Sequence, residues 1–360
     1  MSNEIYERLR ETLDTIPNGF PKSKEGLDIL ILKKIFTEEE AELACDLKMN
    51  WETPETIAAR TGRDREYLRE KLREMRLRGE IFGAKINEVE IYKLMPYVFG
   101  IFEFQIKRMD REFADLNERY HKEVFAGDFF TPSPQMMKVV PIEKTIPSHS
   151  VVKTYESVKE IISNAKDWAV DECICKKEKG LLGHECSYPK EVCLGFAPIE
   201  NYFKTGSWGR QISKDEAYAI LDMSEKAGLV HLTSNIQKGH IFICNCCSCC
   251  CGVLRAANLM GVKQSVAHSD YMAVVDRDKC IACGNCEERC HVEGIKIDTY
   301  AEVNDRCIGC SLCVTTCPEE AITIQLRPDK DILDVPADEK DWTSKRGIST
   351  GRTSYKEKLL

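Results

Sequence analysis

The chain has 360 residues, 43% of them apolar, and carries a net charge of −8 at neutral pH. This length provides cores for about two or three domains, and the acidic balance argues against a general nucleic-acid binder, which carries a basic excess. Nineteen cysteines stand out, because disulfide scaffolds of that density are small secreted chains. The chain opens on a charged amphipathic helix rather than a signal peptide, and it contains no apolar run of about 18 residues. We therefore expect a cytoplasmic protein without a membrane span whose thiols bind metal.

Residues 1–125 are predicted to form a helical domain. Apolar residues at helical spacing cover 26–48, and Thr37 and Glu40 have the spacing of a capping box for the second half of this helix. Pro54 follows a threonine and marks the first turn of the next helix.

A further helix is expected between Gly62 and Gly79, and the alternating stretch 81–94 indicates a β-hairpin. Helix, turn, helix and hairpin in this order are typical of a winged helix-turn-helix. A long amphipathic helix over 99–125 is expected to complete the domain. Its one cysteine, Cys45, lies on an apolar helix face and is expected to be a buried structural residue.

The predicted recognition helix of this winged-helix-like domain carries a basic stripe. Arg69, Arg73 and Arg76 share one face, as a helix in a DNA groove requires. Glutamates at helical spacing interleave with these arginines and neutralise them in local pairs, and acidic residues outnumber basic ones over the whole domain. Such a domain gains little from counterion release on nucleic acid. We therefore expect it to dock a protein or to form a homodimer.

The remainder of the chain divides by composition. Residues 126–150 hold four prolines and no clear period, which predicts a linker. Residues 151–272 are predicted to form a cysteine-rich α+β domain, and residues 273–326 a smaller domain built on an internal repeat. Residues 327–360 are polar without an apolar period, which predicts a tail without regular structure. The fold class expected for the chain is α+β.

The repeat in residues 273–326 consists of two runs with the spacing Cys-x2-Cys-x2-Cys-x3-Cys. The first run is Cys280, Cys283, Cys286 and Cys290, and the second is Cys307, Cys310, Cys313 and Cys317, followed by Pro318. Zinc ribbons use two separated Cys-x2-Cys pairs and four ligands. Two evenly spaced runs of four therefore favour iron–sulfur clusters over zinc.

This spacing resembles that of the bacterial two-cluster ferredoxins. The resemblance implies a ferredoxin-like fold with two 4Fe–4S clusters, in which the last cysteine of each run binds the cluster of the other run. By that resemblance one cluster is held by Cys280, Cys283, Cys286 and Cys317, and the second by Cys307, Cys310, Cys313 and Cys290. It also implies electron transfer within a larger iron–sulfur protein of anaerobes.

His291 occupies the position after the fourth cysteine of the first run, where the second run has Pro318. One interpretation is a surface histidine without a role. The other is a titratable ring that tunes the potential of the neighbouring cluster. Both stay open from the sequence.

Ten further cysteines precede the repeat, as an upstream quartet and as the octet CNCCSCCC. They are Cys173, Cys175, Cys186 and Cys193 in the quartet, and Cys244, Cys246, Cys247, Cys249, Cys250 and Cys251 in the octet. Adjacent Cα atoms are about 3.8 Å apart, too close for an ordinary disulfide, so the octet indicates metal. The quartet has the complement of one 4Fe–4S cluster, although its loose spacing leaves zinc open. We expect one or two additional centres here, with ligands possible from both segments.

These features predict an iron–sulfur protein that passes electrons to or from a partner oxidoreductase. The chain has no G-x-G-x-x-G that opens a strand–helix unit and no G-x-x-x-x-G-K phosphate loop, so no nucleotide cofactor is indicated. Two alternatives stay open, namely an oxidoreductase with a catalytic cluster in residues 173–251 and a redox-sensing winged-helix regulator that binds DNA. The missing nucleotide motif favours the relay over a self-contained enzyme.

Overall fold

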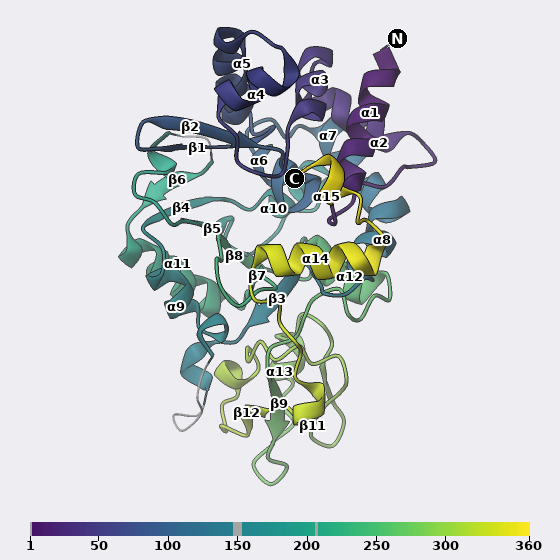
Figure 1. The fold of residues 1–360 in the computed structure, drawn as a ribbon. Helices are drawn as coiled ribbons and strands as arrows, with labels where there is room; N and C mark the ends of the chain where they lie inside the picture. The colour runs from purple at the N-terminus through teal and green to yellow at the C-terminus, as the bar shows by residue number, and fades with distance from the viewer. Residues whose placement is uncertain (1, 147–152, 206–207) are drawn as a thin grey trace.

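A computed structural model describes residues 2–146, 153–205 and 208–360. Helices and strands are mixed, as expected for the α+β class. The N-terminal helices lie at one end of the molecule, a six-stranded sheet lies in the middle, and the segment that holds the cysteine repeat lies at the opposite end (Figure 1). Across the residues described, no helix has the length and apolar content needed to cross a membrane.

The N-terminal region follows the predicted order of elements. It contains α1 (Ser2–Thr15), α2 (Leu27–Ile35), α3 (Glu38–Asp46), α4 (Pro54–Thr61), α5 (Arg65–Leu77), β1 (Phe82–Ile86) and β2 (Val89–Lys93). The capping box is present, because the Glu40 N–H donates to Thr37 Oγ1 at 3.3 Å and the Thr37 N–H donates to Glu40 Oε2 at 2.8 Å. It begins a separate helix, α3, since the chain becomes extended at Phe36. Whether these elements act as a winged helix stays a prediction.

The long helix predicted over 99–125 is interrupted instead. The chain is irregular at Tyr97–Ile101, and then forms the short α6 (Phe102–Phe104), α7 (Arg111–Tyr120) and α8 (Ala126–Phe130). Asp110 begins α7 by accepting a hydrogen bond from the Phe113 N–H at 2.8 Å. The irregular stretch brings Phe99 against Phe242 of the central sheet, with ring centroids 5.5 Å apart. Tertiary packing therefore overrides the helical period here.

The central sheet is antiparallel and has the strand order β3-β7-β8-β5-β4-β6. Its strands are β3 (Met137–Val140), β4 (Asp167–Glu172), β5 (Glu191–Ala197), β6 (Arg210–Ile212), β7 (Val230–Ser234) and β8 (Phe242–Cys246). The predicted linker 126–150 thus supplies α8 and the fully buried strand β3, while its residues 147–150 lie outside the described residues. A strand of four buried residues has no alternation of apolar and polar side chains, so it shows no period that predicts a strand.

The two faces of the sheet are covered differently. On one face, α9 (Val158–Ser163) and α11 (Lys214–Ala227) share a core with Ile243 of β8. The opposite face carries Cys244 and Cys246 of the same strand, because side chains alternate along it. This second face receives α10 (Ile174–Leu181) and α12 (Gly252–Leu259), and α7 and α8 pack on these two helices. The ten middle cysteines gather between these layers.

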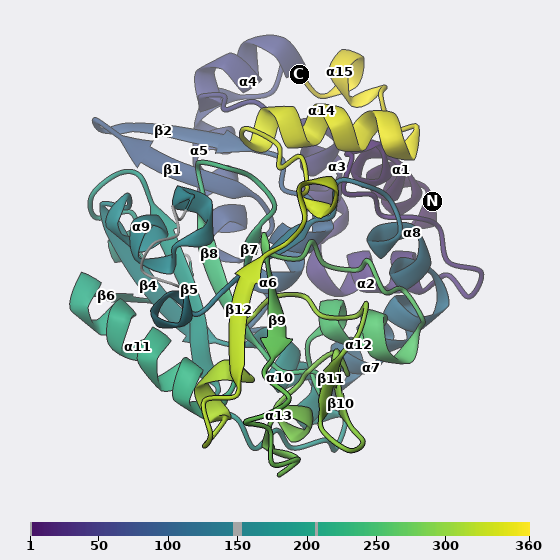
Figure 2. The same cartoon turned by 90° about the horizontal axis from the view of Figure 1, so that it is seen from below.

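The C-terminal segment is ordered, in contrast to the predicted tail. It forms α14 (Glu339–Thr350) and α15 (Tyr355–Lys358), which lie on the side of the N-terminal helices in the view of Figure 2. Trp342 Nε1 donates to the Gln135 carbonyl at 2.9 Å. Arg346 is fully buried and donates to the carbonyl groups of Phe129, Pro132 and Pro134. Since α14 is held mainly by polar contacts, its sequence shows no apolar period.

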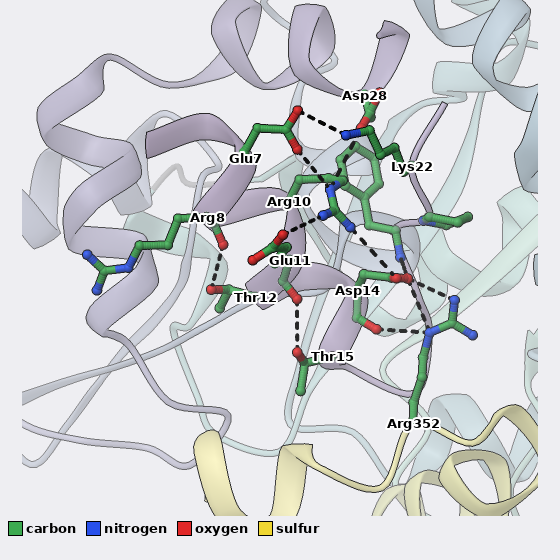
Figure 3. Close-up of polar contacts among 12 residues, drawn as sticks. Glu7, Arg8, Arg10, Glu11, Thr12, Asp14, Thr15, Lys22, Asp28 and Arg352 are labelled. Atoms are coloured by element: carbon green, nitrogen blue, oxygen red, sulfur yellow. Dashed lines mark hydrogen bonds and ion pairs between the residues drawn. The ribbon is translucent and has the colours of Figure 1, made fainter. Parts of the chain in front are cut away.

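A second polar contact ties the C-terminal segment to α1. Arg352 donates to the Asp14 carboxylate at 2.8 Å and to the Asp14 carbonyl at 2.9 Å (Figure 3). On the same helix, Arg10 lies between acidic side chains and forms an ion pair with the buried Asp28 at 3.9 Å (Figure 3). The two ends of the chain are therefore joined by ion pairs and by hydrogen bonds to backbone.

We predict that Arg346→Met lowers the free energy of unfolding by about 3 kcal/mol, because buried carbonyl groups lose their donor. The measurement is urea unfolding of the metal-loaded chain under anaerobic conditions. Lys340→Met is the matched control, since Lys340 is exposed on the same helix and should change stability by less than about 0.5 kcal/mol. Equal small effects of both variants would contradict a structural role for the Arg346 contacts.

Candidate metal centres

The cysteine repeat folds around two short sheets. β9 (Tyr271–Val275) pairs with β12 (Ile322–Leu326), and β10 (Ile295–Ile297) pairs with β11 (Ala301–Val303). The first cysteine run leads into the short helix α13 (Asn285–Glu288), and the second run leads into a single 3-10 turn. Each run therefore forms a tight loop whose thiols face inward.

The loops enclose two small cavities, and each cavity takes cysteines from both runs. The first, of about 20 Å³, is lined by Cys280, Cys283, Cys286 and Cys317. The second, of about 30 Å³, is lined by Cys290, Cys307, Cys310 and Cys313. The structure thus brings together the two crossed sets implied by the ferredoxin resemblance, and ligation of iron by them stays a prediction.

Backbone N–H groups in this module point at the sulfurs. The Gly294 N–H donates to Cys290 Sγ at 3.1 Å, and the Ala321 N–H donates to Cys317 Sγ at 3.2 Å. Such hydrogen bonds stabilise the thiolate form that binds metal and tune the potential of a cluster. In each run the donor lies four residues after the last cysteine. The two halves of the repeat therefore share this hydrogen bond as well as their cysteine spacing.

His291 is buried and connects this module to the octet. Its Nδ1 accepts hydrogen bonds from the N–H and the hydroxyl of Ser248, at 3.2 and 3.0 Å, and its Nε2–H donates to the Gly228 carbonyl at 2.6 Å. These partners fix the neutral tautomer, and burial also lowers the pKa of the ring. A surface histidine is excluded because the side chain is only 7% exposed.

Four of the middle cysteines form a compact group, which we call the four-thiol site. They are Cys186, Cys247, Cys249 and Cys250, whose sulfurs all lie within 4.8 Å of one another. Cys186 Sγ lies 3.8 Å from Cys247 Sγ and 3.7 Å from Cys249 Sγ. A hydrogen bond from Cys250 lowers the pKa of Cys247 to about 5. Within the part of the chain that the structure describes, no other group of three or more metal-binding side chains is this compact.

The remaining six form a closed ring of sulfurs, which we call the six-thiol ring. In order of contact the members are Cys173, Cys193, Cys244, Cys246, Cys251 and Cys175. Successive thiols hydrogen-bond, and the ring closes through the electrostatic interaction of Cys251 with Cys175. Hydrogen bonds from Cys193 and Cys246 lower the pKa of Cys244 to about 5. All six line one cavity of about 90 Å³.

The quartet predicted as one ligand set is divided between the two sites. Cys186 joins the four-thiol site, whereas Cys173, Cys175 and Cys193 belong to the six-thiol ring. Each of the two sites thus combines cysteines of the quartet with cysteines of the octet, as in the prediction of ligands from both segments. Cys173 and Cys175 meet because Cys173 is the N-cap of α10 and Cys175 lies in its first turn.

The octet is divided in the same way, for a reason visible in its local structure. Cys244 and Cys246 lie on the inner face of β8, and the chain then turns through Cys247 to Cys250. Cys251 caps α12 and returns to the ring. The thiols of the strand and of the helix start therefore face the ring, and those of the turn face Cys186.

Positive charge and helix ends surround the ring. Cys173 is the N-cap of α10 and Cys251 is the N-cap of α12, so two helix N-termini meet at the sulfurs. Lys176 is 1% exposed, and its charge favours the thiolate forms of Cys173 and Cys244. The thiolates of Cys173 and Cys244 are thereby partly compensated without solvent.

A buried ion pair closes the cavity behind α12. Arg255 donates two hydrogen bonds to the Glu118 carboxylate, at 2.9 and 2.5 Å, and Lys179 lies 3.2 Å from the same group. Burial alone would raise the pKa of Glu118, but hydrogen bonds from Arg255 and Lys122 outweigh it and lower the pKa to about 2. Cys45 takes no part in these sites, since it lies on α3 and burial raises its pKa to about 11.

Comparison with known protein families matches residues 273–324 to a 4Fe–4S dicluster domain. The match contains both cysteine runs and confirms the ferredoxin-like character of this module. It does not extend to the cysteine-rich middle of the chain, and no curated protein and no solved structure matches the chain. The dicluster domain together with the thiol groups defines the chain as an iron–sulfur protein suited to electron transfer.

We predict that Gly309→Ala disrupts the second ferredoxin cluster while Gly284→Ala does not. Both glycines have positive φ, of 71° and 86°, but a Cβ at Gly309 would lie 2.1 Å from the Tyr271 carbonyl oxygen, and nothing lies within 4 Å at Gly284. Gly284→Ala should cost about 1 kcal/mol of backbone strain. Gly309→Ala should in addition lose about four iron atoms per chain, as measured by anaerobic iron analysis. Equal iron content in both variants would contradict this packing argument.

We predict that Glu118→Gln destabilises the protein by about 3 kcal/mol at neutral pH, because Arg255 is left buried without its counter-charge. Urea unfolding at pH 7 tests this. Since the pKa of Glu118 is lower in the folded than in the unfolded chain, its contribution is present above about pH 4.5 and declines as the pH falls toward about 2. Asp305→Asn, which removes an exposed ion pair with Lys263, is the control and should have little effect.

Proposed function

We propose that the protein is an electron-transfer component in which the ferredoxin module exchanges electrons with a partner oxidoreductase and relays them to a metal centre buried in residues 173–251. The observation that carries the proposal is the contact of His291 with Ser248. His291 follows a cysteine of the second ferredoxin cavity, and Ser248 lies between two cysteines of the four-thiol site. These hydrogen bonds join the second ferredoxin cavity to the octet, whose Cys246 and Cys251 belong to the six-thiol ring.

The first ferredoxin cavity is suited to exchange with a partner. Among the described cysteines Cys283 alone is exposed, and Ile281 beside it is 62% exposed. Both residues line the first cavity. The module that holds this cavity, with β9, β11, β12 and α13, lies at the end of the molecule opposite the N-terminal helices (Figure 1). The exposure of Ile281 supports contact with a second protein at this cavity.

The second ferredoxin cavity faces the interior. Ile308 and Leu312 line it and belong to the main hydrophobic core. The Ser311 hydroxyl accepts a hydrogen bond from the Ile142 N–H at 3.0 Å, just beyond β3 of the central sheet. The two cavities thus have different surroundings, one toward solvent and one toward the core beside the central sheet, which supports a direction of transfer along the molecule.

A second candidate function is reduction of a small molecule at the buried centre. The cavity bounded by the six-thiol ring also contacts Glu103, whose carboxylate accepts a hydrogen bond from the Gly100 N–H at 2.6 Å. A carboxyl group beside a metal centre can hold a proton for a reaction there. Turnover by the purified chain with an artificial electron donor distinguishes this candidate from a pure relay.

The N-terminal contacts favour protein docking over DNA reading. Arg69 is paired with Glu55, and Arg73 lies 3.0 Å from Glu90. Arg76 is buried and donates to the Gly83 carbonyl at 3.0 Å. Because the three arginines of the stripe pair with other groups of the protein, α5 has little free positive charge for phosphate. A gel shift at moderate salt in both oxidation states tests the regulator alternative.

We predict that His291→Leu slows electron arrival at the buried centre, because the contact with Ser248 is lost. Arg289→Leu is the matched control, since Arg289 flanks the same cysteine and donates to the Glu225 carbonyl at 2.7 Å without touching the octet. Freeze-quench EPR after mixing with titanium(III) citrate measures the rate for each cluster, and iron content should equal that of the parent chain. In the parent chain, a centre in residues 173–251 that stays oxidised while the ferredoxin clusters are reduced would contradict the proposed relay, and so would equal rates in the two variants.

A further inference from the structure

The six-thiol ring has more ligands than a 4Fe–4S cluster uses. A four-iron cube takes one ligand at each of four corners. Six thiols in one closed ring are too many for one cube and too few for two separate cubes. They also form one site, because neighbouring thiols interact around the ring and all six line the same cavity.

The four-thiol site does not draw on these six. Four of its sulfur–sulfur distances are 3.3 to 3.8 Å and all lie within 4.8 Å. This spacing suits four thiolates around a single tetrahedral ion, because zinc–sulfur bonds of about 2.3 Å place the ligands about 3.8 Å apart. One zinc ion therefore satisfies Cys186 and the thiols of the octet turn. The six thiols of the ring therefore need a metal centre of their own.

The volume of the ring's cavity can be compared with the cavity volumes of the two ferredoxin sets. The cavities enclosed by the two ferredoxin sets are about 20 and 30 Å³, whereas the cavity of the ring is about 90 Å³. All three are bounded by cysteines in the same structure, so the comparison is internal. The cavity that the ring lines is therefore larger than those of the ferredoxin sets, and it is bounded in addition by Cys247, Cys250 and side chains other than cysteine.

The sequence origin of the thiols divides the ring into halves. Cys173, Cys175 and Cys193 are contiguous around it and come from the upstream segment. The octet supplies the other half as Cys244, Cys246 and Cys251. Each half begins one helix, α10 or α12, whose N-terminus favours negative charge. The arrangement is therefore two sets of three, each with its own electrostatic support.

We propose that the six-thiol ring holds an iron–sulfur cluster larger than a cube, built as two linked four-iron units that each receive three thiolates. A sulfide shared between the units occupies the fourth corner of each, so six protein ligands complete eight iron atoms. This cluster is the buried centre of the relay and so rests on the proposed function. Apolar side chains, including Phe99, Phe102 and Phe130, line the same cavity and exclude water from it.

The test is anaerobic iron, sulfide and zinc analysis of the full chain and of the double variant Cys246→Ser/Cys251→Ser. The variant is expected to lose about eight iron atoms per chain and to keep its zinc and the iron of the ferredoxin module. Cys45→Ser is the control for loss of a thiol outside the sites and should keep all iron. The EPR signal of the reduced ferredoxin clusters reports that the variant has folded.

A loss of about four iron atoms would overturn the proposal in favour of one cube with two unused thiols. A loss of zinc without iron would also overturn it. Should the variant fail to fold, Mössbauer spectroscopy of the parent chain decides, because about half of its iron is expected in the linked cluster rather than in ferredoxin-type cubes. These measurements count atoms, whereas the relay is tested by rates, so either can fail without the other.

Discussion

Burial of sulfur anions is the constraint on which this structure depends. A cysteine binds metal as the thiolate, and a buried charge is costly unless donors or counter-charges surround it. The ferredoxin module meets this requirement with backbone N–H groups such as those of Gly294 and Ala321. The middle of the chain meets it with two helix starts and the buried Lys176. Placing α10 and α12 against one face of the sheet is therefore an electrostatic arrangement as much as a packing one.

The parts of the chain that bind no metal complete the enclosure. α7 contributes Glu118, which neutralises Arg255 of α12 in the interior. Aromatic side chains of the irregular stretch Tyr97–Ile101 line the cavity of the six-thiol ring. α14 in turn holds the segment between α8 and β3 through Arg346. Residues near both ends of the chain thus shield a site formed by residues in its middle.

The sequence was sufficient where a pattern is local. The cysteine spacing predicted the dicluster module, and Thr37 with Glu40 predicted the start of a helix, because both depend on neighbours a few residues apart. The partition of the middle cysteines depends on which strand and helix ends meet, so Cys186 could not be separated from its quartet by spacing. The same holds for His291, whose partner lies 43 positions away, and for Arg346, whose acceptors lie more than 200 positions away. Contacts made by polar groups over such separations leave no period in the sequence.

The division of the octet has a consequence for how the chain can vary. Cys246 and Cys247 are joined by one peptide bond, yet their sulfurs belong to different centres. Insertion or deletion of a single residue between them would exchange thiols between the strand face and the turn, even with every cysteine retained. Ligation of both centres therefore requires the exact length of the octet as well as its cysteines. The ligands of one centre cannot shift in sequence without displacing the ligands of the other. A related chain could change its partner and would still have to keep these eight positions in step.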